Sequence, residues 1–206
     1  MDDHMASASR RRLSKPERHA QLLDSARRLI RERGTDDFTL ARLAEHAGVT
    51  KPLVYEHFGD RAGVLAELYR AFESRQRETL AAALLDAPPD VDVVADIMAG
   101  AYIDCCLAEG RELADVVAAL TGSSTLSRLR QEAEDAYLRM CRAALEPLTG
   151  PREPAELVAV VGAGDALARR ALDGSLSADH ARTALARLIA MIATVNSNAT
   201  EGKTSA

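Results

Sequence analysis

The sequence has no tryptophan, and its four tyrosines and three phenylalanines amount to only 3% of 206 residues. The hydrophobic fraction of 47% must therefore come mainly from Ala, Leu and Val. β-sheets favour aromatic and β-branched residues, whereas small and straight-chain residues suit closely packed helices. The composition predicts an all-α protein.

Long apolar runs are missing as well. No stretch approaches the roughly 18 apolar residues that a membrane-spanning helix needs, and the N-terminus lacks the apolar core of a signal peptide. The three cysteines, Cys105, Cys106 and Cys141, are odd in number and two are adjacent, so they do not form a disulfide framework. These absences predict a cytoplasmic protein.

The motifs of metal sites and enzymes are also absent. Four of the five histidines precede residue 60 and all three cysteines follow residue 100. There is no Cys-x-x-Cys, His-Glu-x-x-His, Walker or Gly-x-Ser-x-Gly motif. Val-Gly-Ala-Gly at 161–164 lies within a helical pattern with no preceding strand, which disfavours a dinucleotide loop. We expect no metal, no cofactor and no enzymatic activity.

Charge is distributed unevenly along a chain whose net charge is −5. Residues 9–51 hold 11 Lys or Arg against 6 Asp or Glu, whereas residues 52–206 hold 15 against 23. A basic N-terminal quarter on an acidic chain indicates a local anionic partner.

Capping and breaking residues divide the chain into about nine helices. Ser14 and Glu17 form a capping box for the first helix, Gly34 ends it, and Asp60 caps a long helix that continues into the 80s. Between them, two short helices begin after Thr39 and Thr50. Apolar spacing beyond Pro88-Pro89 predicts five more helices, at 91–108, 112–121, 125–148, 154–173 and 178–196.

Residues 39–58, TLARLAEHAGVTKPLVYEHF, have the pattern of a helix-turn-helix. Leu40, Leu43 and Ala44 give the first helix an apolar side that holds the two helices together. The second helix would then turn Thr50 and Lys51 outward, where a DNA major groove could receive them.

The segment from about 20 to 68 resembles the DNA-binding domain of the TetR family of transcriptional regulators. The resemblance lies in Gly48-Val49-Thr50, Val54-Tyr55-Glu56-His57-Phe58, Arg61 and Leu65. It implies that Thr39, Tyr55, His57 and Arg61 contact DNA phosphates, and that Thr50, Lys51 and Leu53, with Val54 or Glu56, lie where bases or the adjacent backbone are read. Helix N-termini and basic side chains attract phosphate independently of any family.

Several of these residues have other interpretations. Glu56 could accept a hydrogen bond from cytosine or pair with a nearby arginine. Thr39 and Thr50 would cap their helices in any protein, and Tyr55 could be a packing residue with its hydroxyl at the surface. Arg10–Arg12 could be a solvated arm, and the three-helix unit could instead bind protein. Phe58 is expected in the core, holding the second short helix against the first helix of the chain.

The resemblance also implies how the chain is divided. We expect a disordered basic arm at 1–13, a helix-turn-helix domain at 14–60 that continues into a linking helix at 60–85, a helical effector-binding and dimerisation domain at 86–196, and a disordered tail at 197–206.

The last two long helices are expected to form the homodimer interface. Their apolar faces are Val160, Ala163, Gly164, Leu167, Ala168 and Ala171 on one helix, and Leu185, Leu188, Ile189, Ile192 and Val195 on the other. The alternative is that these faces belong to an intramolecular core.

Candidate effector-pocket residues share helical faces at spacings of three and four. They are Met98, Tyr102, Cys105, Tyr137, Met140 and Cys141. The alternative for each is plain core, and a role for the cysteines in redox sensing is disfavoured because no basic residues flank them. The scarcity of aromatics disfavours a stacking pocket built for flat polycyclic cations, and Asp104 and Glu109 are expected on a solvated face rather than at a bound cation.

Taken together, these patterns predict a homodimeric repressor that binds a palindromic double-stranded DNA operator and is released by a small, largely apolar effector. A helical protein-interaction module that binds no operator is the alternative.

Overall fold

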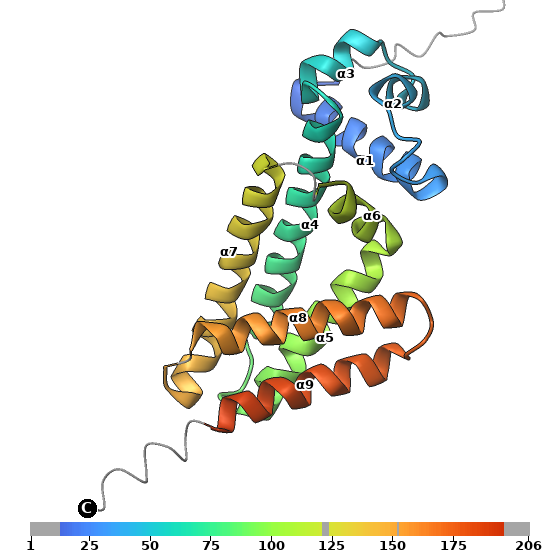
Figure 1. Ribbon diagram of the computed structural model, residues 1–206. Coiled ribbons are helices and arrows are strands. Elements are labelled where there is room, and N and C mark those ends of the chain that lie inside the picture. Colours follow the sequence, from blue (N-terminus) through green and yellow to red (C-terminus); the bar gives the residue numbers. More distant parts are fainter. Residues whose placement is uncertain (1–12, 121–123, 152, 196–206) are drawn as a thin grey trace, which may run out of the picture. The chain divides into compact units, whose positions relative to one another are not determined.

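The computed structural model describes residues 13–120, 124–151 and 153–195. Within these residues the chain forms nine α-helices and no strand, as the composition predicts (Figure 1). The helices are α1 (Lys15–Arg33), α2 (Leu40–Ala47), α3 (Lys51–Phe58), α4 (Arg61–Leu84), α5 (Val91–Glu109), α6 (Arg111–Leu120), α7 (Ser124–Thr149), α8 (Pro154–Leu172) and α9 (Ala178–Val195). The expected arm, apart from Leu13, and the expected tail lie outside the described residues.

The chain divides into two compact units, residues 1–64 and 65–206, with the boundary inside α4. In the first unit, Leu22, Ile30, Phe38, Leu43 and Val54 form a buried core that joins α1, α2 and α3. Burial of this apolar surface is the main force that holds the three helices together, because α2 and α3, with eight residues each, are marginal in isolation.

A close backbone approach fixes the turn between α3 and α4. A Cβ atom on Gly63 would lie 2.0 Å from the Phe58 carbonyl oxygen, so only glycine fits at this position. The Gly63 N–H also donates to Asp60 Oδ1 over 2.7 Å, which confirms the expected cap by Asp60. The end of the helix-turn-helix is therefore set by backbone packing and one cap.

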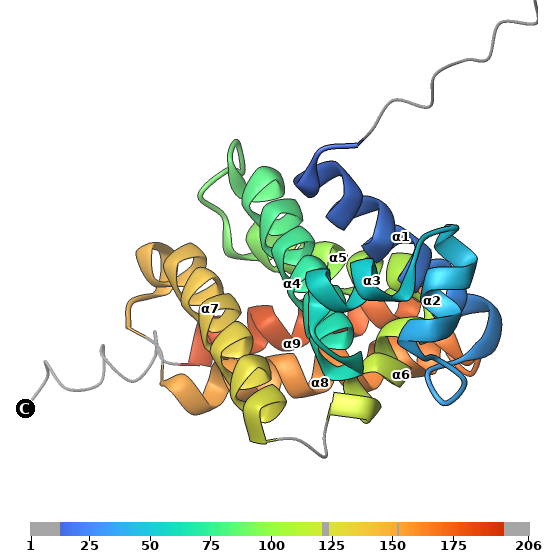
Figure 2. The same cartoon turned by 90° about the horizontal axis from the view of Figure 1, so that it is seen from above.

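In the second unit, α5 packs against both α8 and α9, which lie side by side (Figures 1 and 2). Gly164 and Ala168 of α8 and Leu185 and Ile189 of α9 are buried within this unit. The faces expected to meet a second copy therefore belong largely to the intramolecular core, since a small-residue stripe serves close packing within a chain equally well. The structure does not describe the side chain of Val195.

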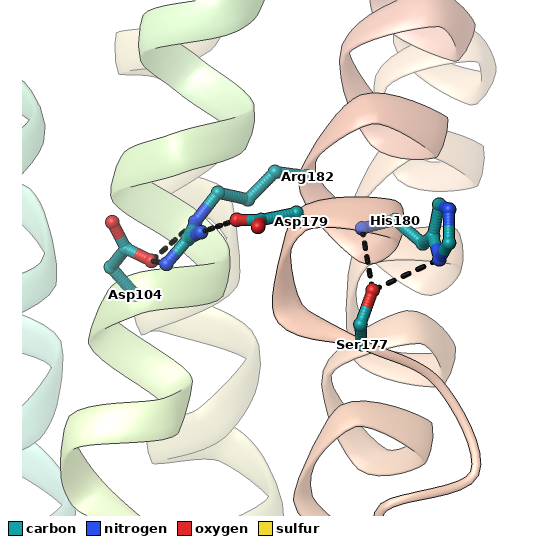
Figure 3. A network of polar contacts seen from close by, with 5 residues as sticks. All are labelled: Asp104, Ser177, Asp179, His180 and Arg182. Carbon is teal, nitrogen blue, oxygen red and sulfur yellow. Dashed lines mark hydrogen bonds and ion pairs between the residues drawn. The ribbon is translucent and has the colours of Figure 1, made fainter.

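An ion-pair network joins α5 to α9 (Figure 3). Arg182 Nε donates to Asp104 Oδ1 over 2.7 Å, and its Nη1 contacts Asp179 Oδ1 at 2.5 Å. Ser177 accepts the His180 backbone N–H over 3.2 Å and so caps α9. Asp104 is thus exposed, as expected, but paired.

Candidate nucleic-acid interface and ligand cavity

Helix α3 presents a polar surface beside its buried side. Val54 and Phe58 face the core, whereas Thr50, Lys51 and Tyr55 are exposed. Tyr55 is 53% exposed, which is unusual for a large aromatic side chain and leaves its hydroxyl accessible. Leu53 is half-buried.

The two threonines at the helix starts differ. Thr39 Oγ1 accepts the Arg42 backbone N–H over 3.2 Å and caps α2 as expected. Thr50 makes no side-chain capping bond to α3, so the expected cap there is wrong. One of the two N–H groups that such a cap can use is missing here, because the second residue of α3 is Pro52. Both threonines are exposed.

Arg61 holds the first unit together from within. Its Nη2 donates to the Thr35 carbonyl over 2.7 Å and its Nε to the Phe38 carbonyl over 3.2 Å. Two donors of the guanidinium thus fix the loop between α1 and α2 from the start of α4. This structural role was not visible in the sequence, because the partners are distant backbone atoms.

His57 lies against α1 beside Phe58. The His57 and His19 ring centroids are 5.5 Å apart, and His19 lies 4.9 Å from Phe58. Phe58 is buried, which confirms its expected core position. Burial, followed by the charges of His19, Lys15 and Arg18, lowers the pKa of His57, although Glu56 opposes this. A neutral imidazole can still donate one hydrogen bond to a phosphate.

Glu56 forms an ion pair across the first unit. Its carboxylate lies 3.5 Å from Lys15 Nζ, and both side chains are largely exposed. The observed partner is a lysine, where the sequence suggested an arginine. An exposed pair contributes little to stability, so Glu56 could exchange this partner for another.

The second unit encloses a cavity of about 350 Å³. All four aromatic side chains beyond residue 64 line it: Tyr69 and Phe72 from α4, Tyr102 from α5 and Tyr137 from α7. The lining is thus more aromatic than the scarcity of aromatics in the sequence suggests, because the fold gathers residues that are far apart in the sequence. The remaining lining is Glu73, Gln76, Cys106, Gly110, Val117, Ala118, Arg130, Glu134, Val161, Asp165, Ala168, Arg169 and Leu172.

Two of the six expected pocket residues, Tyr102 and Tyr137, line this cavity. Met98, Cys105 and Cys141 are instead buried in the surrounding core. Neighbouring residues of a helix point in different directions, so these three side chains point into the core beside the cavity and not into the cavity itself.

Met140 lines a different hollow, of about 390 Å³, with Leu84, Ala87, Pro88, Pro89, Val94, Ala143, Ala144 and Leu148. Helical spacing in the sequence also predicts one wall of the main cavity. Tyr69, Phe72, Glu73 and Gln76 share a face of α4 at spacings of three and four.

A hydrogen bond orders one wall of the main cavity. The Tyr102 hydroxyl donates to Asp165 Oδ1 over 2.7 Å. The ring fits against α8 because the adjacent residue is Gly164, where a Cβ atom would lie 2.7 Å from a Tyr102 ring carbon. Burial and the Asp165 charge raise the pKa of Tyr102, so its hydroxyl remains a donor at neutral pH.

The cysteines are buried thiols. Burial raises the pKa of Cys105 to about 11 and those of Cys106 and Cys141 to about 12. Because the thiolate is the reactive form, all three are poor nucleophiles at neutral pH. This agrees with the expectation against a redox sensor.

The described residues form neither a metal site nor a membrane-spanning helix. No group of three His, Cys, Asp or Glu side chains there is arranged to hold a metal ion. None of the described helices combines the length and apolar character needed to cross a bilayer.

Part of the chain is similar to a known family. Residues 22–68 match the family described as bacterial regulatory proteins, tetR family. The match covers α2, the turn, α3 and the start of α4, and so includes the whole helix-turn-helix.

A curated relative is also similar to part of the chain. The HTH-type transcriptional regulator BetI of Cronobacter sakazakii (strain ATCC BAA-894) is 33% identical over 69 residues, which is 34% of this chain and 34% of the relative. The chain thus matches about a third of this curated relative.

Solved structures extend the likeness of fold to most of the chain. A TetR-like transcriptional regulator from Rhodococcus sp. RHA1 superimposes with a TM-score of 0.68 at 24% identity and covers 86% of this chain and 96% of its own. SmeT, solved in complex with triclosan, has a TM-score of 0.62 at 16% identity and covers 83% and 88%. At these identities the likeness concerns the fold alone.

Proposed function

We propose that this chain is a cytoplasmic, DNA-binding transcriptional repressor that leaves a palindromic operator when a small effector binds its second unit. The observation that carries the proposal is the TetR-family helix-turn-helix, which presents Lys51, Tyr55 and Thr50 on the exposed side of α3. A short helix with accessible donors and a positive charge suits the DNA major groove and its phosphates.

Each predicted DNA contact has a physical role in this proposal. Lys51 neutralises a phosphate, and Tyr55 and Thr39 donate hydroxyl hydrogen bonds to the backbone. The Thr50 hydroxyl is not used as a cap, so it is available for a base or a phosphate. Leu53 contacts an apolar base edge such as a thymine methyl group.

His57 and Arg61 would not contact phosphate as fully available cations. His57 serves as a neutral donor, which its lowered pKa supports. Arg61 donates two hydrogen bonds to the carbonyls of Thr35 and Phe38, so its phosphate contact would use the remaining N–H groups.

A palindromic operator needs two copies of the chain, spaced about one helical turn of DNA apart. We assign the dimer interface to the outer faces of α8 and α9. Val158 and Met191 are 47% and 57% exposed. Small exposed side chains continue this face along α8 at Ala155, Ala159, Gly162 and Ala166. Such a stripe permits close approach of helices from a second copy.

Effector release would follow from a shift between two populations of dimers with different spacings of their DNA-binding units. The cavity in the second unit provides the binding site. The complex of SmeT with triclosan is an example of a protein of this fold that binds a small molecule.

An electrophoretic shift assay with the chain's own upstream DNA tests the proposal. We expect binding to this DNA to exceed binding to random DNA of equal length. Tyr55→Phe should weaken binding about tenfold, because it removes one phosphate hydrogen bond. Arg139→Ala removes an exposed charge from α7 and serves as the control.

Equal affinity for random DNA would contradict the proposal. No shift at all, together with a stable complex with another protein, would favour the interaction module instead. Size-exclusion chromatography with light scattering tests the dimer: Met191→Glu should yield monomers, whereas Met140→Glu, in the other hollow, should not.

A further inference from the structure

The lining of the main cavity includes a nearly buried, uncharged polar side chain, Gln76. Gln76 lines the cavity and is only 4% exposed. No hydrogen bond from its side-chain amide to another described residue is observed, and its polar atoms are not among the fully buried ones that lack a partner. Its polar atoms therefore face the cavity, where a ligand or water can satisfy them.

Glu73 lies one turn before Gln76 on α4 and adds a carboxylate to the same wall of the cavity. Glu73 is 7% exposed and also lines the cavity. Glu134 and Asp165 add two further carboxylates. Arg130 and Arg169 supply the basic lining, and both of these residues are exposed. Solvent screens an exposed charge far more strongly than a buried one, so the negative charge dominates inside the cavity.

The remaining walls are aromatic. The Tyr102 and Tyr137 rings meet edge to face with centroids 5.6 Å apart, and Tyr69 and Phe72 of α4 also line the cavity. The face of an aromatic ring carries partial negative charge and attracts cations. The bond from Tyr102 also fixes the position of the Asp165 carboxylate.

We propose that this cavity binds an organic cation, an aromatic or alkyl body carrying a protonated or quaternary amine. The amine lies between Glu73 and Asp165, and the apolar body packs on the tyrosine and phenylalanine rings. This inference rests on the proposed function, because it names the class of effector. It replaces the expectation of a largely apolar effector with a charged one.

The alternative ligands fit the cavity less well. An organic anion would meet the exposed Arg130 and Arg169 but would bring its charge toward the buried Glu73. A neutral ligand would leave the acidic wall without a counter-charge. Gln76 can donate or accept and so does not distinguish the three classes.

Isothermal titration of the full-length protein with three matched probes tests the inference. The probes are benzyldimethylhexylammonium, its uncharged analogue with carbon in place of nitrogen, and 4-hexylbenzenesulfonate. We expect the ammonium to bind with one site per chain and at least about tenfold more tightly than the other two.

Variants assign the effect to the acidic wall. Glu73→Gln keeps the shape of the side chain and should lower the ammonium affinity about tenfold. Glu78→Gln, on the same helix but exposed and bonded to Ser74, is the matched control and should change nothing. Asp165→Asn should also weaken ammonium binding. If Glu73→Gln does not fold, Asp165→Asn alone tests whether the acidic wall binds the ammonium group.

Equal or tighter binding of the sulfonate or the neutral analogue would overturn the inference, as would equal ammonium affinities of the wild type and both cavity variants. The same preparations are tested for DNA binding. Retained DNA binding without ammonium binding refutes this inference alone, whereas ammonium binding without sequence-specific DNA binding refutes the proposed function alone.

Discussion

The two units use their few aromatic residues in opposite ways. The first buries Phe38 and Phe58 but leaves Tyr55 half-exposed on α3. The second buries all four of its aromatics around one cavity. An exposed aromatic with a hydroxyl suits an external polymer, whereas an aromatic enclosure suits a small molecule. The comparison agrees with the proposal that the first unit binds an external partner and that the second binds a small molecule in its cavity.

The largest expected effect comes from Gly63→Ala, which should unfold the first unit selectively. The new Cβ atom would lie 2.0 Å from the Phe58 carbonyl oxygen, and a shift of the backbone to relieve this clash would lower the stability of the fold. We expect a loss of about 3 kcal/mol or more from the first unit and no DNA binding. Calorimetry should still show a transition for the second unit, and ammonium binding should persist.

The control for this variant is Gly100→Ala on α5, where a Cβ atom meets nothing within 4 Å. It should be neutral or slightly stabilising, because alanine favours a helix over glycine. Unfolding of both units by Gly63→Ala in a single transition would show that they are not independent, and the comparison would then fail.

Arg61→Ala should have the next largest effect, again on the first unit. The carbonyls of Thr35 and Phe38 would lose their charged donor, at a cost of about 1–3 kcal/mol. Chemical denaturation followed by circular dichroism measures this loss. A variant that weakens DNA binding with unchanged stability would instead show that Arg61 acts only on phosphate.

Gly164→Ala should affect only the second unit. A Cβ atom there would lie 2.7 Å from the Tyr102 ring, which must shift away from Asp165. We expect ammonium affinity to fall about tenfold at a stability cost of about 1–2 kcal/mol, with DNA affinity unchanged. Unchanged titration curves would show that the Tyr102–Asp165 bond does not shape the site.

The smallest effect is the pH dependence that Glu73 gives to the second unit. Burial raises its pKa above the ordinary 4.5, the charges of Asp165 and Glu134 act in the same direction, and Tyr69 and Arg77 oppose them. The folded state then holds this proton more tightly than the unfolded state. The contribution of Glu73 to stability is therefore fully present below its unfolded pKa of about 4.5 and is lost as pH rises through the folded pKa.

Denaturation of Glu73→Gln should lack this decrease, because glutamine does not titrate, while Glu78→Gln should retain it. Identical pH profiles for the wild type and Glu73→Gln would contradict the assignment of the effect to Glu73.

The two units also differ in how far their sequences predicted them. The helix-turn-helix lies within twenty consecutive residues, 39–58, so capping and apolar spacing located it and its exposed residues. The contacts of Arg61 were missed because its carbonyl partners lie 26 and 23 residues earlier in the chain.

The cavity was predicted only in part. Its lining runs from Tyr69 to Leu172 over five helices, and helical spacing alone does not say which face of each helix meets the others. Tyr102 and Tyr137 were found because both are large and amphipathic, whereas the acidic wall on α4 was missed because Glu73 resembles a solvated residue.

The salt dependence of DNA binding by the wild type and Lys51→Ala tests the central claim most directly. Fluorescence anisotropy with the chain's own upstream DNA should show that the variant binds more weakly and that its logarithmic salt slope is smaller by about one per bound copy. An unchanged slope, or equal affinity of the wild type for random DNA, would contradict the account of α3 as the helix that reads DNA.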